Sequence, residues 1–435
     1  MTKLHLSSIV LALSISMVAT AQNSKAILHE HPELSAGFYH SYDVHCSDSL
    51  APSRPEGYEP FYISHYGRHG SRWHTSEKKY KPVLDILEKA YAEDALTQQG
   101  ENLLEKMRII AKDAQNRYGE LSPRGELEHK AIAERMFWTY PEVFSTKNGH
   151  KPRIDSKSTI IIRCILSMAA NNERLKELNP DMIMTRESSR RNMWYMSNRH
   201  LSDSLQLFNK AGIINDSLMV RWIKPKRFIK NVFSSRSFVK NEIPNPHEWM
   251  YDVFLIAGIM ESSDHLGIDL FDYFTEDELY DLWRCINVYG YITMGPSLKY
   301  GDANLEDAKP LLRNIIETAD KVVYQGEDIS ASLRFGHDSN IIPLLSLIGV
   351  ENVAVRVSIE EAQKYWNLSK VSPMATNLQF IFFKPEGKTE SDDIKVRVLY
   401  NERDAKLPLE NAPFYEWEDL KTYLESRLAL KTSFN

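Results

Sequence analysis

The residues best suited to chemistry are five consecutive ones, Arg68-His69-Gly70-Ser71-Arg72. Two guanidinium groups on either side of an imidazole can bind a phosphate dianion through paired hydrogen bonds. Gly70, and Gly67 before the run, let the backbone approach such an anion closely. A neutral His69 could then attack phosphorus, because histidine titrates near neutral pH. The alternative interpretation is a solvated basic loop with a hydrogen-bonded histidine.

A second segment, residues 333–339, has a related layout late in the chain, where a predicted strand ends at a glycine and a helix follows. His337 could contact the same phosphate. Asp338 is a candidate general acid for the leaving oxygen and then a base for water. Taken alone, Asp338 is better interpreted as a helix N-cap, a position that aspartate favours.

A third candidate is Arg163, which directly follows the apolar run Thr159–Ile162. That run predicts a strand, and open α/β sheets bind ligands where their strands end. Taken alone, an ordinary surface arginine is the better interpretation of Arg163.

Three histidines close in sequence, His65, His69 and His74, raise the question of a metal site. Their spacing would suit one face of a helix, but the two intervening glycines favour a loop. We therefore expect no metal at these residues.

The elements around these candidates alternate between strands and helices. The alternation stops between about residues 195 and 320, where helical patterns dominate, and then resumes. This order predicts an α/β core with an inserted all-helical domain. The expected strands are 60–65, 159–162, 181–184, 330–334, 378–383 and 395–400, and the expected early helices are 79–92, 101–116 and 126–140. The expected divisions are a signal peptide at 1–21, a first α/β core segment at 22–190, the helical insert at 191–325 and a second α/β core segment at 326–435.

The first 21 residues have the layout of a secretory signal peptide, with Lys3 near the start, an apolar stretch at 6–18 and small residues at 19–21. The apolar stretch is shorter than the roughly 20 residues that a membrane span needs. We therefore expect an exported protein, periplasmic or secreted, without stable membrane insertion after cleavage.

The composition is that of a globular protein: 43% of the 435 residues are hydrophobic and 26% are charged. The net charge of −6 lacks the basic excess that is typical of nucleic-acid binders, so no nucleic-acid partner is expected. The three cysteines, Cys46, Cys164 and Cys285, allow at most one intramolecular disulfide. The fold must therefore rest on its hydrophobic core.

The order of the three candidate segments resembles that of the histidine acid phosphatase superfamily, whose members carry Arg-His-Gly-x-Arg early, a single arginine in the middle and His-Asp late. A narrower resemblance is to the multiple inositol polyphosphate phosphatases. The wider resemblance also rests on residues 121–126 and 344–349, and the narrower one on residues 374–378, 401–403 and 407–408.

This chain departs from those patterns at two places. The narrower group typically has His-Ala-Glu where this chain has His337-Asp338-Ser339, so Asp338 is expected to be the acid, as in the wider family. The wider family often has proline at the position of His74. The departures concern the substrate more than the chemistry.

The resemblance implies a three-layer α/β core with a central mixed sheet. It implies that His69 is the nucleophile, forming a phosphohistidine, and that Asp338 protonates the ester oxygen. It implies no metal and no other cofactor, because arginine and histidine cations balance the phosphate charge. The implied phosphate-binding residues are Arg68, Arg72, Arg163 and His337.

The expected activity is hydrolysis of a small-molecule phosphomonoester, with inositol polyphosphates such as phytate as leading substrates. A broad acid phosphatase acting on sugar phosphates is the alternative of the same class. A phosphomutase is disfavoured by the export signal, and a non-catalytic phosphate-binding protein by the presence of both His69 and Asp338. Basic runs at 186–191 and 224–230 could line a polyanion pocket, although such runs are usually solvated faces.

Overall fold

The computed structural model describes residues 24–45, 54–146, 151–197, 201–388 and 393–430. The expected signal peptide and Cys46 lie outside these residues. Within them, no helix is long and apolar enough to cross a membrane.

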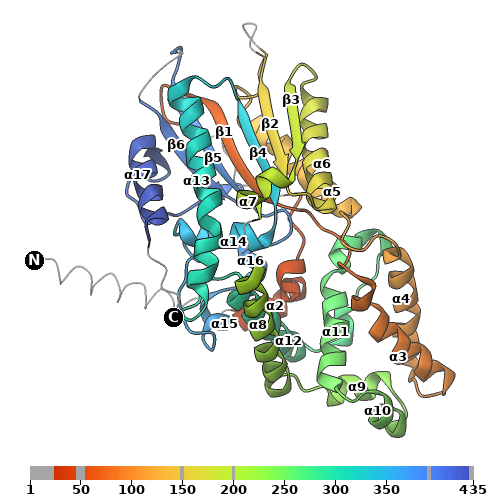
Figure 1. The fold of residues 1–435 in the computed structure, drawn as a ribbon. Helices are drawn as coiled ribbons and strands as arrows, with labels where there is room; N and C mark the ends of the chain where they lie inside the picture. Colours follow the sequence, from red (N-terminus) through yellow and green to blue (C-terminus); the bar gives the residue numbers. More distant parts are fainter. Residues whose placement is uncertain (1–23, 46–53, 147–150, 198–200, 389–392, 431–435) are drawn as a thin grey trace, which may run out of the picture.

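A central mixed sheet organises one half of the molecule (Figure 1). Its strand order is β3-β2-β4-β1-β5-β6-β7, and β8 also pairs with β6. The four strands from β3 to β1 are parallel, whereas β5 and β6 are antiparallel to their neighbours. This arrangement confirms the predicted α/β class. The strands are β1 (Tyr58–Arg68), β2 (Arg153–Ser158), β3 (Ile183–Ser188), β4 (Ala331–Gly336), β5 (Asn377–Pro385), β6 (Lys395–Tyr400), β7 (Arg403–Asp404) and β8 (Phe414–Glu416).

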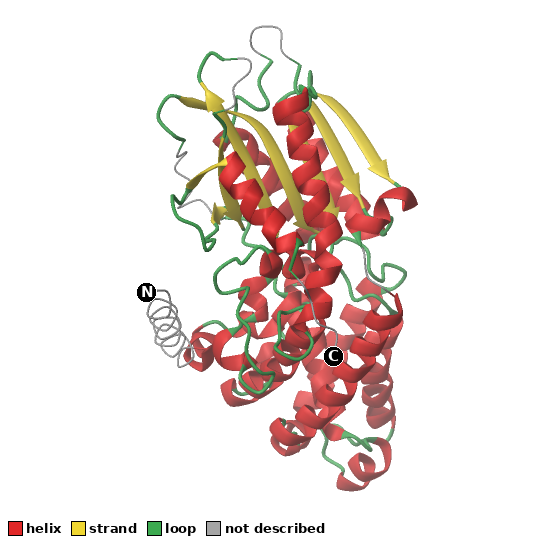
Figure 2. Cartoon of the chain, turned by 60° about the vertical axis from the view of Figure 1, so that its left-hand side comes forward, coloured by secondary structure: helices red, strands yellow, loops and turns green. Residues whose placement is uncertain are grey.

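Helices cover both faces of the sheet (Figures 1 and 2). Because successive side chains of a strand point to opposite faces, β1 places Ile63 with the core under α5 and α6, and Tyr62 and Tyr66 with the core under α14. The central strands β1 and β4 are almost entirely buried, as strands covered on both faces must be. The covering helices are α5 (Pro123–Thr139) and α6 (Ile162–Leu178) on one face, and α13 (Gly301–Gln325), α14 (Asp338–Leu347) and α17 (Trp417–Leu428) on the other.

The other half of the molecule is helical (Figure 2). Segments from before residue 191 contribute to it, because η1 packs against α12 and α4 packs against α9. The helical half is thus not made of residues 191–325 alone, and the predicted boundaries of the helical insert stay a prediction. The remaining helices are α2 (Ser24–Glu30), η1 (Pro32–Tyr39), η2 (Glu77–Lys79), α3 (Lys81–Ala92), α4 (Gln98–Ala114), η4 (Arg190–Asn192), α7 (Met193–Met196), α8 (Leu201–Trp222), α9 (Lys226–Val232), α10 (Arg236–Glu242), α11 (Pro246–Gly258), η5 (Met260–Leu266), η6 (Phe271–Tyr273), α12 (Glu276–Thr293), α15 (Ala362–Tyr365) and α16 (Leu368–Val371).

The predicted strand at 159–162 is wrong. The strand of this region is β2, which ends at Ser158, and α6 begins at Ile162. β2 buries polar side chains; one of them, Ser156, donates its hydroxyl hydrogen to Asn172 Oδ1 at 2.9 Å. These satisfied serines hide the strand from a prediction based on apolar residues.

The predicted end of the first strand is also too early, because β1 continues through Gly67 to Arg68. A Cβ at Gly67 would lie 2.8 Å from the ring of His65, so this glycine serves close packing within a strand and is not a break.

Candidate active site

The candidate residues meet where β1 and β4 end side by side. The two strands are parallel, and Arg68 is opposite Gly336 in their register. The residue that follows each strand is a histidine, so the pairing of the strands alone brings His69 and His337 together. The backbone N–H of His69 donates to Gly336 O at 2.9 Å, and the two ring centroids are 5.7 Å apart.

His69 is held in one tautomer and kept neutral. Its Nδ1 lies 2.9 Å from Gly70 O, and a carbonyl oxygen only accepts, so the proton is on Nδ1 and Nε2 has the lone pair. Burial lowers the pKa of His69 well below its usual range, and the positive charges of Arg163, Arg68 and Arg72 lower it further. An imidazole in this state is a nucleophile over a wide pH range.

Arg68 is fully buried and anchored on three sides. Its Nη1 donates to Ser372 O at 2.6 Å, and its Nη2 donates to Phe38 O at 2.8 Å. The same Nη2 is 3.0 Å from Asp338 Oδ2. Burial lowers the pKa of Arg68, while the Asp338 carboxylate favours its charged form. The guanidinium is thus a fixed positive charge at the floor of the site.

Asp338 is the first residue of α14, and the N-cap position itself belongs to His337. Burial raises the pKa of Asp338, but Arg68, His337 and Arg72 outweigh it and bring the pKa down to about 2. Its Oδ1 also accepts from Ser339 N at 2.8 Å. The carboxylate is therefore ionised in the ligand-free site.

Arg72 and Arg163 have donors to spare. Arg72 uses Nη1 to donate to Trp73 O at 2.9 Å, and its guanidinium lies over the ring of Tyr39, 5.6 Å from the centroid. Arg163 lies in the first turn of α6, where burial and the charge of Arg72 lower its pKa to about 10. Among the described residues, the buried Nε of each arginine has no hydrogen-bond partner. These two N–H groups suit an incoming anion.

His337 is positioned by residues of β1 and of the segment around the start of α6. Its Nε2 is 3.1 Å from Thr159 Oγ1, and its backbone N–H donates to the Tyr66 hydroxyl at 3.2 Å. Cys164 contacts the same ring, and its thiol donates to Gly336 O at 3.2 Å. Burial raises the pKa of Cys164 to about 11, which suits a thiol that packs in the interior.

Two contributions to the site were missed from the sequence. The first is the N-terminal segment, residues 37–42, which supplies Phe38 O to Arg68 and the Tyr39 ring to Arg72. The second is Glu128 of α5, a buried carboxylate beneath residues 69–72, which are called the arginine loop below. Burial raises the pKa of Glu128 to about 7, opposed by hydrogen bonds from Ser71 and Tyr42. A backbone carbonyl leaves no signal in the sequence, and the only signal for Glu128 is its helical spacing to the buried Gly125 and Ile132.

The other two histidines of the early cluster have packing partners of their own. His65 packs against Phe335 within the sheet, and the Nε2 of His74 faces Leu255 O at 3.1 Å. The described part of the chain has no group of three His, Cys, Asp or Glu side chains that could hold a metal ion. The basic run of α9 lines a cavity of ≈ 720 Å³ against the start of α12, where Arg227 pairs with Glu278.

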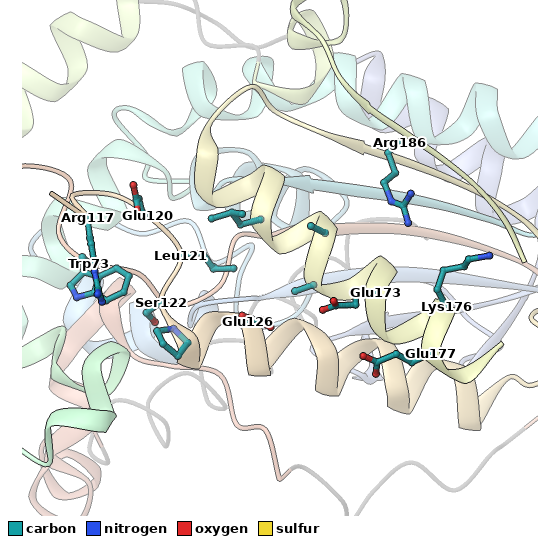
Figure 3. A pocket seen from close by; sticks show the side chains of 14 residues that line it. Trp73, Arg117, Glu120, Leu121, Ser122, Glu126, Glu173, Lys176, Glu177 and Arg186 are labelled. Carbon is teal, nitrogen blue, oxygen red and sulfur yellow. The ribbon is translucent and has the colours of Figure 1, made fainter. Parts of the chain in front are cut away.

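A larger groove of ≈ 980 Å³ runs between α5 and α6 (Figure 3). It adjoins the site through Leu121, whose backbone bridges to Arg72, and it extends to Arg186. Several of its charged groups are already paired; for example, Lys176 donates to two backbone carbonyls. The groove is therefore a neighbour of the site and not its centre.

Comparison with known proteins places the chain in a family. Residues 162–401 match the histidine phosphatase superfamily (branch 2). Multiple inositol polyphosphate phosphatase 1 of Gallus gallus is 29% identical over 139 residues, which is 30% of this chain and 31% of that protein. Its Homo sapiens counterpart is 28% identical over 135 residues, 29% of this chain and 28% of that protein. The match thus spans about a third of these curated relatives.

Solved structures share the fold over most of the chain. The multiple inositol polyphosphate phosphatase of Bifidobacterium longum, in complex with inositol hexasulfate, has a TM-score of 0.75 at 17% identity, covering 90% of this chain and 97% of that one. The phytase from D. castellii has a TM-score of 0.67 at 12% identity, covering 91% of this chain and 85% of that one. With more than half of its length matched by one family, the chain belongs to the histidine phosphatase superfamily (branch 2).

Proposed function

We propose that this chain hydrolyses phosphomonoesters through a phosphohistidine formed at His69. The observation that carries this proposal is the state of the His69 ring, with its proton on Nδ1, its Nε2 lone pair available and its pKa lowered. Three arginines around it would bind the phosphate and neutralise charge on the transferring group. The family membership of the chain supports the same chemistry.

In this proposal Arg68, Arg72, Arg163 and His337 hold the phosphate, and Nε2 of His69 attacks phosphorus. The unpartnered Nε donors of Arg72 and Arg163 support their role. As the new N–P bond forms, the bond from phosphorus to the ester oxygen breaks. The alcohol leaves with a proton from Asp338.

The acid role of Asp338 requires the substrate to be bound. A phosphate dianion competes with the carboxylate for Arg68 and adds negative charge nearby, and both effects raise the pKa of Asp338. The protonated carboxyl then donates to the leaving oxygen. Once the alcohol has left, the carboxylate accepts a proton from the water that attacks the phosphohistidine, which releases phosphate and restores His69.

Inositol polyphosphates such as phytate are the proposed substrates. Support comes from the curated relatives and from the Bifidobacterium longum structure, which was solved with inositol hexasulfate. The layout of residues 1–21 supports export to the periplasm or beyond.

The experiment is phosphate release from phytate and from an aryl phosphate by the wild type, His69→Ala and Asp338→Asn. We expect the wild type to cleave phytate far better and His69→Ala to be inactive. A preference for the aryl phosphate would leave the chemistry intact and remove the substrate proposal. Equal activity of His69→Ala and wild type, or no phosphate release by the wild type, would remove the catalytic proposal.

A further inference from the structure

The loop that carries His69 and Arg72 lies directly on the first turn of α5. A Cβ at Gly70 would come within 2.6 Å of Gly125 O, and a Cβ at Gly125 within 2.2 Å of Ser71 O. Two glycines therefore allow an approach that no other residue pair permits. Backbone contact this close makes the position of the loop depend on what α5 presents beneath it.

α5 presents one buried carboxylate, Glu128, and the loop donates to it twice. Glu128 Oε2 accepts from Ser71 N at 2.8 Å, and Oε1 accepts from the Ser71 hydroxyl at 2.7 Å. The side chain is 0% exposed. Buried hydrogen bonds of this kind are costly to leave unmade, because water cannot replace the lost partner.

The same carboxylate also holds the N-terminal segment. Glu128 Oε1 accepts from Tyr42 N at 2.9 Å, and the Ser41 hydroxyl lies 2.8 Å from the Ser71 hydroxyl. This segment supplies Phe38 O to Arg68 and the Tyr39 ring to Arg72. One acceptor group thus fixes the arginine loop and the segment that packs on its two arginines.

Arg72 depends most on this arrangement. Within the described part of the chain its hydrogen bonding is limited to the carbonyl of the next residue, and its other restraint is the Tyr39 ring. Its guanidinium has no carboxylate partner among the ion pairs of the described residues. Its direction is therefore set by the backbone at Ser71 and by the N-terminal segment, both of which are bound to Glu128.

We infer that Glu128 is a positioning residue for phosphate recognition: its carboxylate joins Ser71 to Tyr42 and so aims Arg72 at the phosphate. The inference rests on the proposed phosphatase function. Glu128 lies behind the loop and takes no part in the bond-making steps. Its loss should weaken the binding of phosphate itself, which a general loss of stability does not do.

The test measures KM for a phosphomonoester and Ki for inorganic phosphate in the wild type, Glu128→Ala and Glu128→Gln. We expect both constants to rise roughly tenfold in Glu128→Ala, the equivalent of one lost buried hydrogen bond. Glu128→Gln keeps one acceptor oxygen, so its KM and Ki should lie between those of the wild type and those of Glu128→Ala. Glu126→Gln is the matched control, because Glu126 is an exposed carboxylate of the same helix paired with Lys130 at 2.7 Å; it should match the wild type.

A purely structural role predicts a different pattern: less active enzyme and a lower Tm, with KM and Ki within twofold of the wild type. That pattern would overturn the inference. If Glu128→Ala does not fold, Ser71→Ala decides, because it removes one donor to Glu128 and the contact with Ser41. An unchanged phosphate Ki in Ser71→Ala would then reject the inference, and a raised Ki would support it. Hydrolysis by the wild type is measured in parallel, so failure of the proposed function is seen separately.

Discussion

Replacing Asp338 by asparagine should have opposite effects on phosphate binding and on leaving-group departure. In the ligand-free site the carboxylate is 3.0 Å from Arg68 Nη2 and competes with phosphate for that guanidinium. Asparagine has a similar shape but carries no charge and no acidic proton. The substitution therefore frees Arg68 for the ligand and removes the proposed acid.

Both effects have magnitudes that an assay can resolve. Charge-assisted hydrogen bonds are about twice as strong as neutral ones, so weakening the competing pair should favour phosphate by about 1.4 kcal/mol, roughly a tenfold lower Ki. Loss of a general acid lowers the rate of the protonated step by about 10²- to 10⁴-fold. The second loss should fall on alkyl phosphates such as phytate, since an aryl oxide leaves without full protonation.

The assay compares kcat/KM for an alkyl and an aryl phosphomonoester, because this constant includes only the steps up to departure of the leaving group. We expect Asp338→Asn to lose at least about 10²-fold on the alkyl ester and less than about tenfold on the aryl ester. Asp302→Asn is a suitable control, because Asp302 is also in the first turn of a helix and pairs with Arg356 at 2.8 Å.

An equal loss of kcat/KM on both esters would refute the assignment of Asp338 as the acid. A rise in the phosphate Ki would refute the argument that the carboxylate competes for Arg68. The two results can be interpreted independently, because the phosphate Ki is an equilibrium constant and the leaving-group effect is a ratio of kcat/KM values.

Three further predictions concern the packing and charges of the site. Arg163→Met removes a cation that lowers the pKa of His69, so the acid limb of the pH profile of kcat/KM should move toward neutral pH, whereas Arg174→Met, on the same helix, should leave it in place. Gly125→Ala should lower stability by at least about 1–3 kcal/mol in urea unfolding and abolish activity, because its Cβ meets a backbone oxygen; an undisturbed enzyme would contradict the tight packing. Cys164 should resist thiol alkylation in the folded protein at neutral pH, as judged by mass spectrometry, because burial raises its pKa to about 11.

The sequence predicts the site best where two motifs follow strands that pair with each other. His69 and His337 each follow a strand, and the strands turn out to be parallel neighbours, so the two motifs meet without further information. Arg163 reaches the same site by a route that was not predicted. It lies in the first turn of α6 and does not end a strand, since β2, the strand before it, already ends at Ser158.

The supporting residues could not be predicted for a physical reason. Phe38 acts through its backbone carbonyl, which every residue has. Glu128 lies on the buried face of α5 with Gly125 and Ile132, but its hydrogen-bond partners come from two segments far away in sequence. Motifs report the residues that do chemistry, whereas the geometry that holds those residues depends on tertiary contacts.

The central claim, that His69 carries the phosphoryl group, is tested most directly by trapping. The enzyme is mixed with a ³²P-labelled phosphomonoester, quenched in base during turnover and separated from free label. We predict protein-bound label that survives base, is lost in mild acid, maps to the peptide with His69 and is absent from His69→Ala. Label that persists in His69→Ala, or label that is stable to acid, would contradict the claim.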